Sequence, residues 1–195
     1  MKTRIAVAAV TAAALVAIPS AALAAPGGGQ GGPNGKGAAT QQRSGDCTGT
    51  QVSVGTLTET QLATLQSMAE EEKLAHDVYV ALDEEFGGVV FERIAASEAK
   101  HLNALRRLMV RYDVEDPTAN MADGQFASDS VKQLYDELLG RATTLEDAMA
   151  VGADIERMDI ADLKDAIADA TQRDLKRVYS NLMRGSQRHL VAFTR

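Results

Sequence analysis

A helical segment at residues 89–113 carries two polar residues inside an apolar stripe, and no other feature of the chain constrains its fold as strongly. The apolar positions recur every three to four residues, as on one face of an α-helix; they are Phe91, Ile94, Ala95, Leu102, Leu105, Leu108, Met109 and Tyr112. Glu98 and His101 fall in the same stripe, three residues apart and so on the same face. A buried carboxylate without a partner is unfavourable, so Glu98 requires a proton, a cation or a metal ion. We therefore expect both side chains to point into a helical core.

The rest of the chain from residue 57 onward is also predicted to be helical, because it contains no alternating strand pattern. We expect four long helices and one short helix, at residues 59–86, 89–113, 145–170 and 173–193, and near 130–139. Short turns join the first long helix to the second and the third to the fourth. About thirty residues separate the second from the third, enough to run the length of a bundle. The sequence thus predicts an all-α four-helix bundle, built from two antiparallel hairpins joined by a long crossover that contains the short helix.

The first 56 residues differ in composition from the predicted bundle at residues 57–195. Residues 1–24 have a basic start, an apolar run and a small-x-small ending, the pattern of a secretory signal peptide. The run is too short for a comfortable membrane span, so no membrane insertion is expected after signal removal. Residues 25–56 are rich in Gly, Pro and polar residues and are predicted to form a disordered tether. We expect an exported protein that is secreted, periplasmic or held at the cell surface.

Charge and cysteine content narrow the expected partners. The formal net charge of −7 disfavours nucleic acid and an anionic membrane as partners. Cys47 is the single cysteine, so it has no internal disulfide partner and is either a free thiol or bonded to another molecule. A homodimer is compatible with both features.

The other three long helices also place potential metal ligands in their inward stripes. The first helix offers Glu72, with Glu71 on the opposite shoulder of the stripe as the alternative. The third helix offers Glu156 and Asp159, one turn apart, and the fourth offers His189. Carboxylate oxygens with imidazole nitrogens suit iron, manganese and zinc. Two divalent ions would neutralise the buried carboxylates, so we expect the four helices to converge on a metal site.

Two simpler interpretations remain open for these polar residues. His101 and His189 are also compatible with ordinary core histidines that form hydrogen bonds to Glu98 and Glu156 and set the helix register. His76 is expected to be half-exposed, and Glu70 to lie on a solvated face with other acidic residues. If the buried histidines and glutamates only set the helix register, the bundle is a structural interaction module without a metal.

Several motifs occur in a fixed order within residues 57–193. They are Glu70–Ala75 followed by Asp77–Tyr79, Ile94–Glu98 with His101, Ile155–Glu156 with Asp159–Ile160, and Asn181–Leu182 with Arg184–Ser186 and His189–Leu190. Together they resemble an exported bacterial family of unknown function in the ferritin-like superfamily. The resemblance implies a ferritin-like bundle with a Glu on the first and third helices and Glu-x-x-His on the second and fourth, arranged around two metal ions.

The resemblance also implies roles and one departure. Tyr79, two turns after Glu72, corresponds to a tyrosine found in ferritins. Ser186 stands three residues before His189, where the superfamily has a Glu, so either Asp159 supplies the missing oxygen or a single metal binds. The implied function is binding of one or two ions, iron first and manganese or zinc next. A ferroxidase-like oxidoreductase would oxidise Fe(II) with oxygen or peroxide, and the alternative is metal binding without catalysis.

Overall fold

The computed structural model describes residues 55–195, and this part of the chain is all-helical, with five helices and no strand. The helices are α1 (Glu59–Phe86), α2 (Val89–Tyr112), α3 (Asp129–Arg141), α4 (Leu145–Asp169) and α5 (Arg173–Phe193). The prediction of an all-α fold is confirmed for these residues. None of these helices is long and apolar enough to cross a membrane. The predictions for the signal peptide, Cys47 and almost all of the tether lie outside the described residues.

Local signals set the ends of the first hairpin. At the start of α1, the Thr58 side chain accepts a hydrogen bond from the Gln61 N–H, and the Gln61 side chain accepts one from the Thr58 N–H, both at 3.2 Å. This reciprocal pair is a capping box, which satisfies N–H groups that a helix start leaves unpaired. At the other end, Gly87 has a φ of 65°, a conformation that glycine adopts without a steric penalty. The chain can therefore reverse there and begin α2 two residues later.

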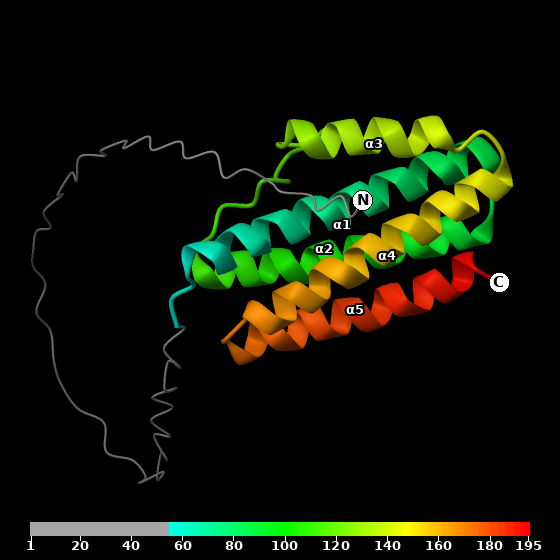
Figure 1. Ribbon diagram of the computed structural model, residues 1–195. Coiled ribbons are helices and arrows are strands. Elements are labelled where there is room, and N and C mark those ends of the chain that lie inside the picture. Colours follow the sequence, from blue (N-terminus) through cyan, green and yellow to red (C-terminus); the bar gives the residue numbers. More distant parts are fainter. Residues whose placement is uncertain (1–54) are drawn as a thin grey trace, which may run out of the picture. The chain divides into compact units, whose positions relative to one another are not determined.

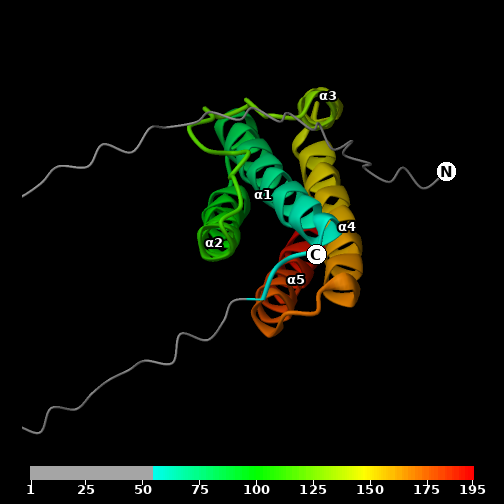
Figure 2. The same cartoon turned by 90° about the vertical axis from the view of Figure 1, so that its left-hand side faces the viewer.

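The four long helices form a bundle with α3 on its outside (Figure 1). α1 and α2 run antiparallel and pack together, as do α4 and α5. From the end of α2 the chain returns along the bundle through residues 113–144, so α4 begins at the same end as α2 (Figure 1). Within this crossover, α3 packs on α1 and α4, as the view down the bundle shows (Figure 2).

The apolar core is divided into two clusters along the bundle. The cluster near the α1–α2 turn includes Leu82, Phe91, Ile155 and Phe193, and the other includes Leu65, Leu105, Leu163 and Leu182. On each long helix, buried polar residues lie between the segments that enter the two clusters; they are Glu72, Glu98, Glu156, Ser186 and His189. These residues form a polar layer across the middle of the bundle, with an apolar seal on each side.

Candidate metal centre

Glu98 lies at the centre of the polar layer and contacts both histidines. Its Oε2 is 2.6 Å from His101 Nδ1, and its Oε1 is 2.7 Å from His189 Nδ1. A second glutamate approaches the same nitrogen atom of each histidine: Glu72 Oε2 is 3.3 Å from His101 Nδ1, and Glu156 Oε1 is 3.6 Å from His189 Nδ1. Two groups of three potential ligands, Glu72–Glu98–His101 and Glu98–Glu156–His189, therefore share Glu98. Within each group the ligand atoms lie within 4.8 Å of one another.

These short contacts do not have hydrogen-bond geometry. His101 Nδ1, His189 Nδ1, Glu98 Oε1 and Glu72 Oε1 are all buried without a hydrogen-bond partner, because neither ring N–H is directed at a nearby oxygen. Buried polar atoms are nearly always paired, and an unpaired one costs about 1–3 kcal/mol. Ligands of a common cation also lie close together without hydrogen bonds between them, so this arrangement is compatible with a cation site.

The electrostatics of the layer favour positive charge near Glu98. Burial raises the pKa of Glu72, and the nearby Asp159 and Glu98 raise it further. Burial alone would raise the pKa of Glu98 too, but its contacts with His101 and His189 outweigh burial and hold that pKa at about 2. For His189, burial acts to lower the pKa, and the contacts with Glu156 and Glu98 raise it to about 9. The layer thus stabilises positive charge beside Glu98, whether protons on the histidines or metal ions carry it.

Tyr79 fixes the carboxylate that α4 contributes. Its side chain is fully buried, and its hydroxyl donates a hydrogen bond to Glu156 Oε1 at 2.7 Å. The carbonyl oxygen of Gly152, one turn earlier on α4, lies 3.3 Å from the same hydroxyl. The tyrosine that the resemblance implied therefore contacts the glutamate of α4, where it limits the directions in which Glu156 can offer its oxygens.

α5 approaches the site unusually closely at Gly185. A Cβ atom at this position would lie 2.5 Å from His101 Nε2, so only glycine leaves room for the ring. The next residue, Ser186, donates its hydroxyl hydrogen bond to the Leu182 carbonyl at 3.1 Å. The sequence analysis missed the role of Gly185, since its only sign was a glycine on the inward face of a helix.

Two of the seven predicted ligands, Glu71 and Asp159, lie beside the layer and outside both three-residue groups. Glu71 accepts a hydrogen bond from the Ser67 hydroxyl at 2.9 Å, so Glu72 is the glutamate of α1 that reaches His101. Glu71 and Asp159 line a narrow cavity that also borders Glu72, Glu98 and Glu156. Its water-accessible space of about 20 Å³ holds roughly one water molecule. Burial, with the charges of Glu98 and Glu156, raises the pKa of Asp159 to about 7 despite a contact with Ser186.

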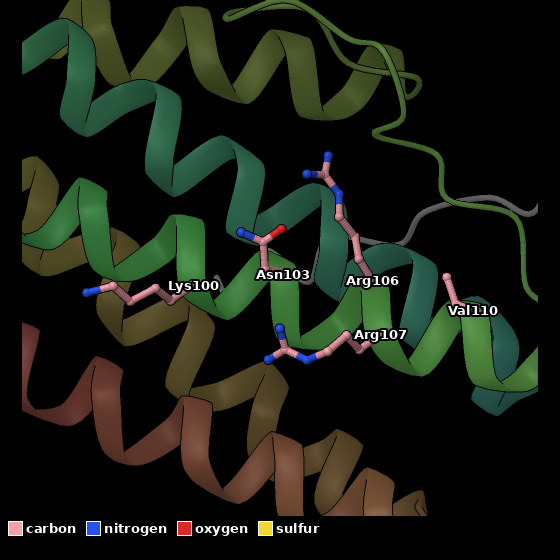
Figure 3. Close-up of a pocket in the computed structure, with 5 residues that line it drawn as sticks. All are labelled: Lys100, Asn103, Arg106, Arg107 and Val110. Atoms are coloured by element: carbon pink, nitrogen blue, oxygen red, sulfur yellow. The ribbon is translucent and has the colours of Figure 1, made fainter.

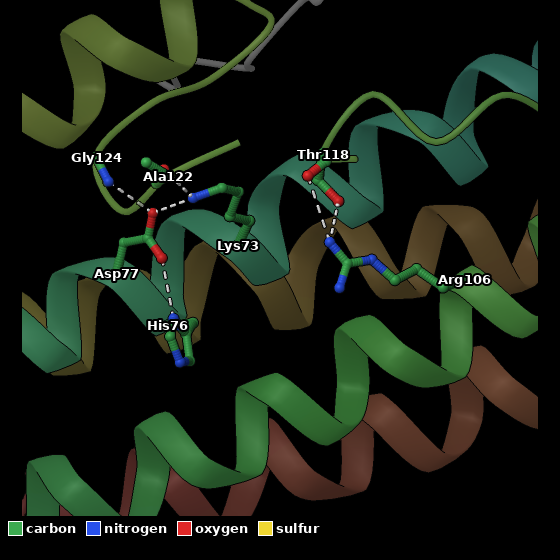
Figure 4. A network of polar contacts seen from close by, with 7 residues as sticks. All are labelled: Lys73, His76, Asp77, Arg106, Thr118, Ala122 and Gly124. Atoms are coloured by element: carbon green, nitrogen blue, oxygen red, sulfur yellow. Dashed lines mark hydrogen bonds and ion pairs between the residues drawn. The ribbon is translucent and has the colours of Figure 1, made fainter. Parts of the chain in front are cut away.

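A second polar network attaches the crossover to α1 (Figure 4). Lys73 forms a buried ion pair with Asp77, which also accepts a hydrogen bond from the Gly124 N–H at 2.9 Å. His76 Nδ1 lies 2.9 Å from the same carboxylate, and the His76 side chain is 28% exposed. His76 and Asp77 also form a three-residue group with Asp123, but Lys73 already supplies the positive charge there. We therefore assign this network a structural role.

The prediction that Glu70 lies on a solvated face is wrong. Its side chain is buried, with 4% exposed, and its Oε1 accepts a hydrogen bond from the Ser128 N–H at 2.9 Å. The crossover covers this side of α1, and Ser128 marks the start of α3. Helical periodicity identifies only the side of α1 that faces the other long helices, so it could not reveal a partner in a loop.

Fold and site together define a helical-bundle protein with a shared layer of carboxylates and histidines in its core. Residues 61–195 match the family described as an uncharacterized protein domain, DUF2202, and the chain belongs to this family. Uncharacterized protein MJ0754 of Methanocaldococcus jannaschii is 42% identical over 132 residues, which cover 67% of this chain and 71% of the relative. The crystal structure of hypothetical protein MJ0754 from Methanococcus jannaschii matches with a TM-score of 0.70 and 39% identity, over 71% of this chain and 80% of that one. This relative is archaeal, so the family is not confined to bacteria.

Proposed function

We propose that the protein binds two divalent transition-metal ions, iron first among them, in the polar layer of a ferritin-like bundle. The observation that carries the proposal is the shared carboxylate. Glu98 offers Oε2 to the group with Glu72 and His101, and Oε1 to the group with Glu156 and His189. Di-iron carboxylate bundles likewise combine single glutamates with Glu-x-x-His pairs that project inward from facing helices.

The residues present fit such a pair of ions in chemistry and in charge. Oxygen and imidazole donors suit Fe(II), Mn(II) and Zn(II), and a carboxylate can bridge two of them. Two divalent ions bring four positive charges to a layer with three glutamates and, at its edge, Asp159. The ions would also provide partners for the buried atoms of Glu72, Glu98, His101 and His189 that have none.

Bound iron would supply electron transfer to oxygen or peroxide, coupled to the oxidation of Fe(II). The chain's own contribution is to position ligands and to limit access. Tyr79 holds Glu156 in place, and the apolar clusters on both sides keep bulk water out of the layer. The acid-lined cavity between α1 and α4 has room for roughly one water molecule. A small cation or a small oxidant fits this space, and a larger substrate does not.

A second candidate function, metal binding without turnover, is favoured by Ser186. Its hydroxyl is bonded to the carbonyl of its own helix, so α5 contributes only His189 to the layer. With one fewer carboxylate, the layer has less negative charge to neutralise a second metal ion. This candidate predicts tight binding with no acceleration of Fe(II) oxidation.

The deciding experiment compares the metal-free full chain with variants in each half of the site. We expect about two equivalents of Fe(II) bound under nitrogen by wild type, about one by His101→Ala or His189→Ala, and none by Glu98→Gln. His76→Ala is the matched control and should bind like wild type. Because a ligand of the native state stabilises it by about 2.7 kcal/mol at one hundred times Kd, the melting temperature should rise saturably with metal. Wild-type binding that survives in Glu98→Gln would refute the shared site.

Admission of air then separates the two candidates. Oxidation of bound Fe(II) much faster than in buffer supports the first candidate, a protein that catalyses Fe(II) oxidation. Oxidation at the buffer rate with stoichiometric binding supports a binding protein. A wild type that binds no metal overturns both candidates.

A further inference from the structure

Charge is strongly segregated among the helices, although the chain as a whole is acidic. α2 and α5 together carry ten Lys and Arg residues against three acidic ones, Glu92, Glu98 and Asp174, and Glu98 is buried. α1 and α4 carry sixteen Asp and Glu residues against three basic ones, Lys73, Arg157 and Lys164. Since α2 packs on α5 and α1 packs on α4, the two kinds of charge lie on different sides of the bundle.

The basic residues of α2 and α5 form two exposed stripes. On α2, Arg93, Lys100 and Arg107 follow one another at intervals of seven residues, so they lie on one line along the helix. Figure 3 shows Lys100 and Arg107 along the outside of α2, where with three neighbours they line a shallow depression. On α5, Arg177 and Arg184 are seven residues apart and Arg188 follows one turn later. We call these six residues the basic face.

Both stripes lie on the same side of the helix pair. α2 and α5 touch where His101 meets Gly185, and the exposed residues Lys100 and Arg184 immediately precede these two. In an antiparallel pair of helices, the residues that directly precede the two contact residues point to the same side of the pair. Arg107 lies seven residues after Lys100, and Arg177 lies seven residues before Arg184, so in the antiparallel pair these two arginines are level with each other. The basic face is therefore continuous across both helices for about 20 Å.

Nothing in residues 55–195 neutralises this face. The ion pairs of this region include Arg111 with Asp174 and Arg106 with Asp116, and none of them involves a residue of the basic face. The preceding 54 residues contain a single acidic residue, Asp46, so they cannot supply the missing charge. Uncompensated like charges gathered on one side of a protein repel one another, and this favours an anionic partner from outside the chain.

We propose that the basic face binds an anionic lipid surface, with α2 and α5 lying flat against it. A plane meets both stripes at once, and clusters of this many Lys and Arg residues on helices bind anionic headgroups. The acidic helices then lie on the far side of the bundle, beyond the screening distance of about 8 Å in physiological salt. The overall negative charge therefore does not prevent binding, in contrast to what net charge alone predicted. In this orientation α1 and α4, which line the cavity beside the polar layer, lie on the side of the bundle away from the lipid.

Two other partners fit the face less well. A nucleic-acid strand would need aromatic side chains for stacking, and the aromatic residues of α2 and α5 are buried or half-buried. A second copy of the chain would have to offer its acidic side, but α3 packs across α1 and α4 there and leaves no flat complement. Neither obstacle applies to a lipid surface.

The test is sedimentation of the full chain with vesicles of phosphatidylcholine alone or with about one-third phosphatidylglycerol. Residues 1–54 carry four basic residues and one acidic residue and are common to all variants, so any binding they cause cancels when the variants are compared on the same vesicles. We expect wild type to bind the anionic vesicles in about 50 mM salt and to be released in about 500 mM salt. Arg107→Glu/Arg177→Glu should reduce binding by about tenfold or more. Arg157→Glu/Lys164→Glu on α4, with the same change in net charge, should stay within about twofold of wild type.

Three results would overturn the proposal. The first is no binding to anionic vesicles beyond that to neutral ones, and the second is an equal loss in the α4 variant. The third is salt-sensitive binding to a different partner that Arg107→Glu/Arg177→Glu abolishes while vesicle binding persists. Sedimentation velocity without vesicles would reveal a second copy, and titration with duplex DNA would reveal a nucleic acid. Unchanged melting curves for both variants confirm that each is folded.

Discussion

A single methyl group added at Gly185 should weaken metal binding strongly while changing the folding stability only slightly. In Gly185→Ala the new Cβ would lie 2.5 Å from His101 Nε2 and 2.6 Å from Cε1, whereas ordinary contacts begin at 3.4 Å. Either the ring moves by about 1 Å or α2 and α5 move apart by a similar amount. His101 Nδ1 lies only 2.6 Å from Glu98 Oε2, so either movement displaces a ligand of the proposed site.

Two opposing effects set the stability of this variant. Replacing a glycine by alanine inside a helix gains about 1 kcal/mol. Overpacking a filled core costs about 1–3 kcal/mol. We therefore expect Gly185→Ala to lose between about 0 and 2 kcal/mol of unfolding free energy. Its metal affinity should fall by about tenfold or more, since changes that only misorient a ligand cost about 10–100-fold.

Gly140→Ala on α3 is the matched control, because no atom lies within 4 Å of its added Cβ. It should gain about 0.4–1 kcal/mol and bind metal like wild type. Urea unfolding of the metal-free proteins and a Zn(II) titration would measure both quantities. If Gly185→Ala were as stabilised as Gly140→Ala and bound metal like wild type, His101 would not lie against Gly185 and the reasoning would fail.

Three further predictions test the surroundings of the site. Tyr79→Phe should lower the unfolding free energy by about 1–3 kcal/mol because Glu156 loses a buried donor; metal stoichiometry should not change, and loss of an equivalent would contradict the role given to Tyr79. Burial opposes ionisation of Asp77, but contacts with His76, Lys73 and the Gly124 N–H lower its pKa. Ionised Asp77 therefore stabilises the fold fully above the pKa of about 4 that it has in the unfolded chain. This stabilisation is lost as the pH falls through the lower pKa that Asp77 has in the folded protein. The stability gap between wild type and Asp77→Asn should therefore shrink below about pH 4, and a constant gap in urea unfolding down to about pH 3 would count against this. Thr58→Ala should cost about 1 kcal/mol through loss of the α1 cap, with unaltered Zn(II) binding.

The helices themselves could be predicted because their signals are local. Apolar periodicity gives each helix an inward side, and Gly87 ends α1 where the sequence indicates. The same periodicity shows that Glu72, Glu98 and His189 face inward, since each lies in line with residues that enter the two apolar clusters. It could not decide between Glu71 and Glu72, because both lie on shoulders of the stripe. The distance from Glu72 to His101 depends on how α1 and α2 are rotated against each other.

The crossover was less predictable because its contacts are specific and distant in sequence. Glu70 bonds to Ser128, and Asp77 to Gly124, across 58 and 47 residues. Such bonds leave no periodic pattern in the sequence, so an acidic residue with a loop partner looks like one that faces solvent.

The basic face could not be predicted from the net charge, for a different reason. A net charge sums over all sides of a molecule and carries no information on how the charges are distributed.

The arrangement of Glu98 favours the proposed metal site over a polar layer that only sets helix register. A register device gains its energy from satisfied hydrogen bonds, and a half-satisfied network is worse than an apolar core. Here both histidines approach Glu98 within 2.7 Å while their Nδ1 atoms have no hydrogen-bond partner. If the proposed metal ions provide the missing partners, the stability of the fold depends on whether the ions are bound. Chelation of bound metal should therefore lower the melting temperature of wild type but not that of Glu98→Gln, and equal melting temperatures with and without metal would favour the register device.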